Sequence, residues 1–271
     1  MRQTFSQDFI IPCLGNAILV EFVSLALLNV ERVISMPAFT ERLQVNGQDM
    51  EMYTSVPSGS GPFPAVVVAF HVDGLDEFDR VMADRLAEAG YVAVVPDLFH
   101  RFTPEIWEGP RLDRLKHLSD PEIIDDINAA VGFLQEHSAV DSSRLGITGF
   151  CMGGRVTWLM AAVSSVFKAA VPYYGGSIMN IWGDGTQSPF DLSSGIDCPM
   201  MFHFGQEDGN PSPDDQVKLD GELTRLGKPH EFFSYPEAGH AFMDHTGQRY
   251  NKEAAETSWP RTLDFFAQHL K

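Results

Sequence analysis

Residues 145–163 read LGITGFCMGGRVTWLMAAV, which is a short apolar run, a glycine-rich turn and a second apolar run. The first run, Leu145–Gly149, predicts a buried strand, and Met152–Val163 predicts a helix. The connecting residues Gly-Phe-Cys-Met-Gly-Gly match a Gly-x-Ser-x-Gly turn in which Cys151 replaces the serine. A strand, a tight turn and a helix in this order are typical of α/β proteins.

The rest of the chain shows the same alternation. Further strands are predicted at Ala65–Phe70, Tyr91–Pro96, Ala169–Tyr174, Met200–Gly205 and Phe232–Tyr235, with a hairpin at 42–56 around Asn46-Gly47. Helices are predicted at 76–89, at 120–137 with Asp120 as N-cap, at 212–226 and at 252–269. This order predicts a doubly wound, mostly parallel sheet with helices on both faces. The long segments 97–119 and 175–198 follow carboxyl ends of strands, where open sheets bind ligands.

Composition narrows the possible partners. The 271 residues are 44% apolar and 21% charged, as expected of a folded protein. A net charge of −18 with no basic run argues against a nucleic-acid partner. The cysteines Cys13, Cys151 and Cys198 lie far apart and are odd in number, so we expect reduced thiols and a cytoplasmic protein.

The first 38 residues differ from the rest and predict an N-terminal extension before a domain at 39–271. Residues 9–30 are strongly apolar, but Pro12 and Glu21 interrupt them, and a glutamate in a bilayer is costly. Three interpretations stay open: a packed or dispensable extension, a weak membrane anchor, and a signal peptide. Translation from Met36 is a further possibility.

Cys151 is the first candidate for chemistry. The turn would place its sulfur at a helix N-terminus, where the helix dipole lowers the pKa of a thiol. The Met152 N–H would then point into a candidate oxyanion hole. A small cysteine buried after a strand is the alternative interpretation.

Two later motifs favour the catalytic interpretation. Asp208, in HFGQED, and His240, in EAGHAF, each follow a predicted strand. The order nucleophile, acid, histidine is that of α/β-hydrolases, and carboxyl ends of parallel strands converge at one edge. Taken singly, Asp208 is also a plausible turn residue and His240 a plausible loop residue.

Over about residues 40–270 the chain resembles the dienelactone hydrolase family, through PDLFHR (96–101), GFCMGGR (149–155), HFGQED (203–208) and EAGHAF (237–242). The resemblance implies an α/β-hydrolase fold and cofactor-independent hydrolysis of an ester or enol-lactone through an acyl-enzyme. It implies Cys151 as nucleophile, His240 as base and acid, and Asp208 as the group that orients His240. It also implies oxyanion donors at Met152 and Val72.

Two positions depart from the family's type enzyme. His71 stands where that enzyme has a glutamate that helps to activate the thiol. Of two arginines that hold a substrate carboxylate there, one matches Arg101 and the other matches Asp244, which has the opposite charge. A neutral ester, lactone or thioester is therefore at least as suitable as an anionic lactone. His71 is either a second base or donor, or a loop histidine bonded to the backbone.

The same residues are compatible with other functions. A thioesterase, an acyltransferase with this triad, and a non-catalytic binding protein of this fold remain alternatives. His240, Asp244 and His245 lack metal-ligand spacing, and no nucleotide motif is present, so no metal or cofactor is expected.

His203 is expected to be a packed core histidine. Aromatic candidates for an apolar substrate pocket are Trp107, Tyr173, Tyr174, Trp182 and Phe242, with ordinary packing as the alternative. The expected partner is a small molecule, and the chain is expected to be a monomer or homodimer.

Overall fold

A computed structural model describes residues 38–271. Eight strands form one sheet in the order β1-β2-β4-β3-β5-β6-β7-β8. The strands are β1 (Ala38–Val45), β2 (Gln48–Ser55), β3 (Phe63–Ala69), β4 (Val92–Pro96), β5 (Val140–Phe150), β6 (Phe167–Tyr173), β7 (Met200–Gly205) and β8 (His230–Tyr235). The pairs β1–β2 and β2–β4 are antiparallel and the other pairs are parallel, so the predicted mostly parallel sheet is confirmed.

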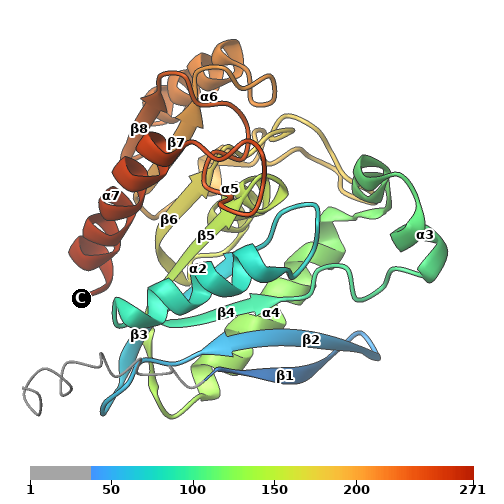
Figure 1. Cartoon of the computed structure of the whole chain (residues 1–271), viewed down its shortest axis with the longest axis vertical. Helices are drawn as coiled ribbons and strands as arrows, with labels where there is room; N and C mark the ends of the chain where they lie inside the picture. The colour runs from blue at the N-terminus through green and yellow to red at the C-terminus, as the bar shows by residue number, and fades with distance from the viewer. Residues whose placement is uncertain (1–37) are drawn as a thin grey trace, which may run out of the picture. The chain divides into compact units, whose positions relative to one another are not determined.

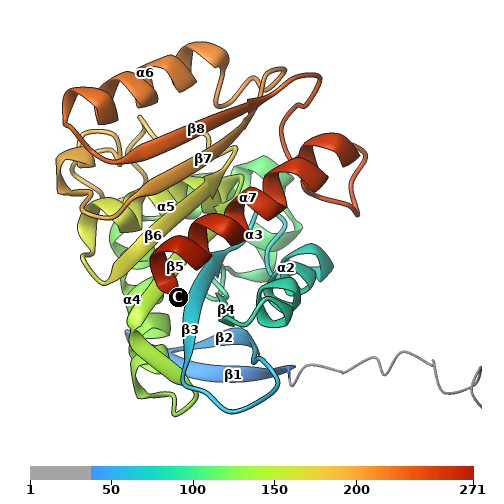
Figure 2. The same ribbon diagram turned by 90° about the vertical axis from the view of Figure 1, so that its left-hand side faces the viewer.

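Helices cover both faces of this sheet. The longer helices are α2 (Glu77–Glu88), α4 (Asp120–Glu136), α5 (Met152–Val163), α6 (Pro213–Arg225) and α7 (Lys252–Leu270). Helices α2 and α7 lie on one face and α4 and α5 on the other (Figure 2). The predicted hairpin turn is confirmed, because Asn46 and Gly47 have φ of 50° and 81°, as a tight two-residue hairpin requires.

The segment between β4 and α4 contains structure that the sequence did not predict. Residues 97–119 hold two short helices, α3 (Pro104–Glu108; Figure 1) and η1 (Arg111–His117). Neither helix contains a buried residue. The predicted N-cap of α4 was wrong. Ser119 is the cap residue, and Asp120 turns its carboxylate inward to the buried guanidinium of Arg155.

Three glycines leave room for the backbone contacts of the turn between β5 and α5. A Cβ atom on Gly153 would lie 1.9 Å from the carbonyl oxygen of Ala69, at the end of β3. A Cβ on Gly149 would lie 2.2 Å from the Gly153 carbonyl oxygen, and one on Gly154 would lie 2.5 Å from that of Tyr173. These neighbours are backbone atoms that cannot swing away, so α5 starts in direct contact with β3 and β6.

The predicted extension at 1–38, with the apolar run 9–30 and Cys13, lies outside the described residues except for Ala38. Within 38–271, no helix combines the length and the apolar character needed to cross a bilayer.

Candidate active site

Cys151 occupies the turn between β5 and α5. Its backbone has φ 56° and ψ −115°, a left-handed conformation that a side-chain-bearing residue adopts only under constraint from its surroundings. The Cys151 N–H donates to the Tyr173 carbonyl at 3.1 Å, which ties the turn to the end of β6. The sulfur thus lies at the N-terminus of α5, beside that helix's free N–H groups.

His240 connects Cys151 to Asp208. His240 Nδ1 lies 2.8 Å from Asp208 Oδ2, and its ring lies close enough to the Cys151 sulfur for the two groups to shift each other's pKa. The other Asp208 oxygen accepts the Asn210 N–H at 2.8 Å, and the Asp208 side chain is nearly fully buried. The residues predicted as nucleophile, histidine and acid therefore lie together, although they follow three different strands, β5, β8 and β7 respectively.

The electrostatics of this trio favour a charged pair. Burial raises the pKa of the Cys151 thiol, but the hydrogen bond and charge of His240 and the Met152 N–H outweigh it and bring that pKa below its ordinary value. Burial lowers the pKa of His240, but Asp208 and the Cys151 sulfur raise it to about 10. The surroundings therefore favour a thiolate beside an imidazolium more than the isolated side chains would.

Met152 and Val72 are the residues expected to supply the oxyanion donors. The Met152 N–H points to the Cys151 side chain. Val72 is fully buried just after β3, and its N–H donates to no backbone carbonyl within residues 38–271. Val72 follows β3 and Met152 begins α5, so the two expected oxyanion donors come from different parts of the chain.

A cavity of about 370 Å³ opens over this trio. Apolar side chains of Leu112, Leu115 and Trp182 line part of it. Arg111 and Arg249 also line it, and Arg111 is paired with Asp73 whereas Arg249 forms no ion pair among the described residues. The cavity can hold a small molecule with an apolar part and an acidic or polar group.

Two residues proposed for substrate contact lie elsewhere. Arg101 makes two hydrogen bonds to Asp126 of α4, at 2.6 and 2.8 Å, and it does not line the cavity over Cys151. Phe242 is fully buried, and its ring packs against Tyr174 at 5.0 Å between centroids. Asp244, at the position of the second family arginine, accepts the Thr246 N–H at 2.9 Å in a local turn.

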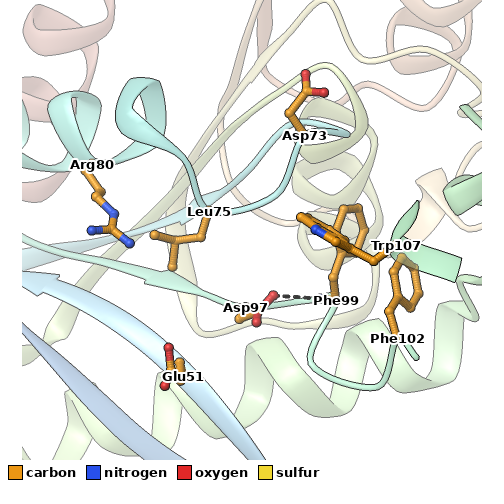
Figure 3. A pocket seen from close by; sticks show the side chains of 8 residues that line it. All are labelled: Glu51, Asp73, Leu75, Arg80, Asp97, Phe99, Phe102 and Trp107. Atoms are coloured by element: carbon orange, nitrogen blue, oxygen red, sulfur yellow. Dashed lines mark hydrogen bonds between the residues drawn. The ribbon is translucent and has the colours of Figure 1, made fainter. Parts of the chain in front are cut away.

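The aromatic candidates separate into three places. Trp182 lines the cavity over Cys151, whereas Tyr173 and Tyr174 are core residues. Trp107 lines a second cavity of about 270 Å³, where Figure 3 shows it beside Phe99 and Phe102. The expected core role of His203 is confirmed, since its ring is fully buried and bonded to Tyr235 and Thr262.

His71 is surrounded by acids. It lies beside Asp73, Asp76 and Asp79. One side-chain nitrogen or oxygen from each of His71, Asp76 and Asp79 lies within 4.8 Å of the other two. The His71 Nε2 to Asp76 Oδ2 distance of 2.8 Å is that of a hydrogen bond, and the other Asp76 oxygen caps α2 through the Phe78 N–H. We therefore describe the group as a hydrogen-bonded ion pair.

Sequence reasoning missed several residues of the site, namely Arg111, Arg249, Asn210 and Asp76. The repeated aspartates in HVDGLDEFD, residues 71–79, were a usable signal for the acids around His71. The sequence held no comparable signal for Arg111 and Arg249, because their positions depend on how η1 and the loop after β8 fold.

Comparisons with known proteins agree with this geometry. The family model described as "Dienelactone hydrolase family" matches residues 50–270. A Methylorubrum extorquens protein named "Putative carboxymethylenebutenolidase" is 32% identical over 80% of this chain and 76% of its own length. A Bradyrhizobium protein named "Probable 2-oxo-3-(5-oxofuran-2-ylidene)propanoate lactonase" is 32% identical over 83% of this chain and 92% of its own.

The solved structures agree as well. A crystal structure titled as a "Putative Dienelactone Hydrolase" from Klebsiella pneumoniae superimposes with a TM-score of 0.80 at 31% identity, over 87% of this chain and 100% of the other. With this fold, these relatives and a family model over most of its length, the chain belongs to the dienelactone hydrolase family of carboxylic ester hydrolases.

Proposed function

We propose that the protein hydrolyses an ester or enol-lactone through a Cys151-His240-Asp208 triad and an acyl-enzyme. The observation that carries the proposal is that Cys151, His240 and Asp208 line one cavity, where His240 is hydrogen-bonded to Asp208 and lies close enough to the Cys151 sulfur for the two groups to shift each other's pKa. The relatives named as carboxymethylenebutenolidase and lactonase support this substrate class.

The first half-reaction forms a thioester. The Cys151 thiolate attacks the substrate carbonyl carbon, a C–S bond forms, and the carbonyl electron pair moves onto oxygen. The N–H groups of Met152 and Val72 donate to that oxyanion. When the oxyanion collapses, the C–O bond breaks and His240 gives its proton to the leaving oxygen.

The second half-reaction returns the enzyme to its starting state. His240 takes a proton from water, and the resulting hydroxide attacks the thioester carbonyl. The C–S bond breaks, and the sulfur leaves as a thiolate stabilised by protonated His240. Asp208 holds the Nδ1 side of the ring, so that Nε2 faces the reacting atoms throughout.

The cavity also bears on the substrate's charge. The family's arginine pair is absent, because Arg101 is bound to Asp126 and Asp244 bonds to its own turn. Arg111 and Arg249 line the cavity from other positions. We propose a substrate with an apolar part against Leu112 and Trp182.

The test is hydrolysis of an activated ester by the wild-type protein, by Cys151→Ala and by Cys198→Ala. Cys198 is the matched control, because it is also a free thiol, but burial raises its pKa to about 11. We expect Cys151→Ala to lose the activity and Cys198→Ala to keep it. Equal rates for all would sink the proposal and favour a non-catalytic binding protein. Supplying thioesters and an alcohol acceptor in the same assay distinguishes hydrolysis from thioester cleavage and acyl transfer.

A further inference from the structure

Asp79 is a buried carboxylate without a hydrogen bond. It lies in the first turn of α2 at 0% exposure, and neither of its side-chain oxygens has a hydrogen-bond partner among residues 38–271. Burial of a carboxylate is costly, so buried charges in proteins are as a rule either paired and hydrogen-bonded or bound to a metal ion. The hydrogen bond between His71 and Asp76 does not include Asp79, which therefore needs an explanation of its own.

Three possible metal ligands face one another at this point. His71 follows β3, Asp76 caps α2, and Asp79 lies three residues later on the same side of that helix. His71 Nε2 is 2.8 Å from Asp76 Oδ2 and 3.5 Å from Asp79 Oδ2. With metal–ligand distances of about 2.0–2.2 Å, the ligand atoms of a tetrahedral site lie about 3.3–3.6 Å apart. The separation from Asp79 already fits, and the separation from Asp76 has to widen by about 0.5 Å.

The charges of the group are out of balance. Arg111 is paired with Asp73, so it does not compensate the other acids. Among residues 38–271, His71 is the only cationic side chain within ion-pair distance of Asp76 or Asp79. One imidazolium leaves two carboxylates with one uncompensated negative charge. A divalent cation bound to a neutral imidazole and two carboxylates gives a net charge of zero. A proton on Asp79 also gives zero, and the experiment below separates these two cases.

Outer contacts hold the three groups in place. Asp73 Oδ2 lies 3.6 Å from His71 Nδ1, on the side of the ring opposite to Nε2. The second oxygen of Asp76 accepts the Phe78 N–H at 2.8 Å. Contacts of this kind orient ligands in metal sites, where a carboxylate often lies behind the histidine. The side chains of Asp73 and Asp76 are 34% and 36% exposed, so an ion can reach Asp79 from solvent.

We propose that His71, Asp76 and Asp79 bind a divalent transition-metal ion such as Zn²⁺ between the end of β3 and the start of α2. One imidazole and two carboxylates suit such an ion, whereas Ca²⁺ and Mg²⁺ prefer oxygen ligands alone. On binding, Nε2 gives its proton to solvent and its lone pair bonds to the ion, while Nδ1–H stays directed at Asp73. None of the three ligands lines the cavity over Cys151, so the ion would fix the β3–α2 loop, and the site does not depend on the proposed function.

The test measures zinc binding in full-length Cys151→Ala protein. This background is needed because a thiolate beside His240 is itself a possible zinc site. The protein is stripped with EDTA, dialysed and titrated with ZnCl₂ by calorimetry, and its thermal unfolding is followed with and without zinc. We expect a zinc site whose occupation raises the unfolding midpoint by about 5–10 °C at free zinc of 100 times Kd.

Variants made in the same background locate the ion. Asp79→Asn keeps the size of the side chain and breaks no hydrogen bond, so it should fold, yet it should abolish this binding and the thermal shift. His71→Gln should do the same. Asp73→Asn changes only an outer contact of the site and should weaken binding by about 10–100-fold. Asp220→Asn is the control, because Asp220 also pairs with a histidine, His230, but without a second carboxylate, and zinc binding should be unchanged.

The outcomes are read without substrate. Absence of zinc binding to the Cys151→Ala protein, or equal zinc affinity in folded Asp79→Asn, would overturn the proposal. If Asp79→Asn raises the unfolding midpoint while zinc has no effect on its parent, a proton alone balances the buried charge, and the proposal is again overturned. Replacement of zinc by Co²⁺ gives an independent readout, since its visible absorption should report tetrahedral nitrogen and oxygen ligands and should disappear in Asp79→Asn. All these measurements use a protein without its nucleophile, so they stand apart from the outcome of the esterase assay.

Discussion

Arg155 and Asp120 form a buried, two-pronged ion pair, with N–O distances of 2.6 and 3.0 Å. Arg155 also donates to the Ser177 and Asn180 carbonyls, and Asp120 accepts the Trp182 N–H at 3.0 Å. The pair thereby connects the helix that follows Cys151 to the loop that forms one wall of the cavity.

We expect Arg155→Met to destabilise the fold by about 3–5 kcal/mol, because Asp120 would be left buried without its partner. The free energy of unfolding in urea measures the loss. The double variant Arg155→Met/Asp120→Leu should recover much of this stability, since no uncompensated charge remains. If the double variant is as unstable as the sum of the single changes, the two residues are not coupled.

Gly153 offers a second test, on packing. Gly153→Ala places a methyl group 1.9 Å from a backbone oxygen of β3, so we expect a loss of more than about 3 kcal/mol or failure to fold. The matched control is Gly221→Ala in α6, where no atom lies within 4 Å of the new Cβ. That control should be more stable by about 0.5–1 kcal/mol, because alanine favours a helix over glycine. Similar thermal stability of both variants would contradict the close approach of α5 and β3.

Local signals explain why the nucleophile turn was predictable. The strand, the glycines and the helix around Cys151 are adjacent in sequence, so their pattern alone defines the turn. Asp208 and His240 were predictable because parallel strands end at one edge, which brings their following loops together. The predicted bounds Met152–Val163 and Met200–Gly205 agree with the structure.

Side-chain pairing over long sequence distances was not predictable. Arg101 follows a strand end as expected, but Asp126 of α4 captures its guanidinium, and no local pattern shows this. Asp120 stands where a helix cap is expected in the sequence, yet its carboxylate pairs with Arg155. Without Asp120 the buried guanidinium would have no ion-pair partner, which would be costly. The helices α3 and η1 bury none of their residues, and so left no apolar period in the sequence.

The pH dependence of activity should reflect the Cys151–His240 pair. The acid limb of kcat/KM follows deprotonation of Cys151, whose pKa lies below the ordinary 9.0, and the alkaline limb follows His240, with a pKa of about 10. Activity should therefore rise at a pH below 9 and fall only near pH 10. Asp208→Asn removes a group that raises the His240 pKa, so its alkaline limb should move to lower pH, with kcat lower by about 10²–10⁴-fold. An activity that first appears near pH 9 would contradict the charged pair.

His203 should make the protein sensitive to acid. Burial lowers its pKa to about 3 from 6.5, so the unfolded chain binds a proton below pH 6.5 that the folded chain does not. Stability from this group is therefore present above pH 6.5 and lost as pH falls toward 3, by up to about 1.4 kcal/mol per pH unit. Urea unfolding at pH 7 and pH 5 measures this, and His203→Gln should show a weaker dependence. An equal dependence in both proteins would mean that other groups cause the acid loss.

Substitution of Arg249 tests whether the substrate carries a negative charge. Its guanidinium lines the cavity over Cys151 and is exposed, without an ion-pair partner in residues 38–271. If the substrate carries a carboxylate, Arg249→Ala should lower kcat/KM for an ester with a free carboxylate by up to about fivefold, since an exposed ion pair contributes no more than about 1 kcal/mol. The methyl-capped ester of the same chain should react as before, and added salt should reduce the difference. Arg225→Ala, a surface arginine of α6 paired with Glu222, is the control. Equal losses for the charged and the capped ester would show that Arg249 shapes the cavity and that the enzyme does not select an anionic substrate through it.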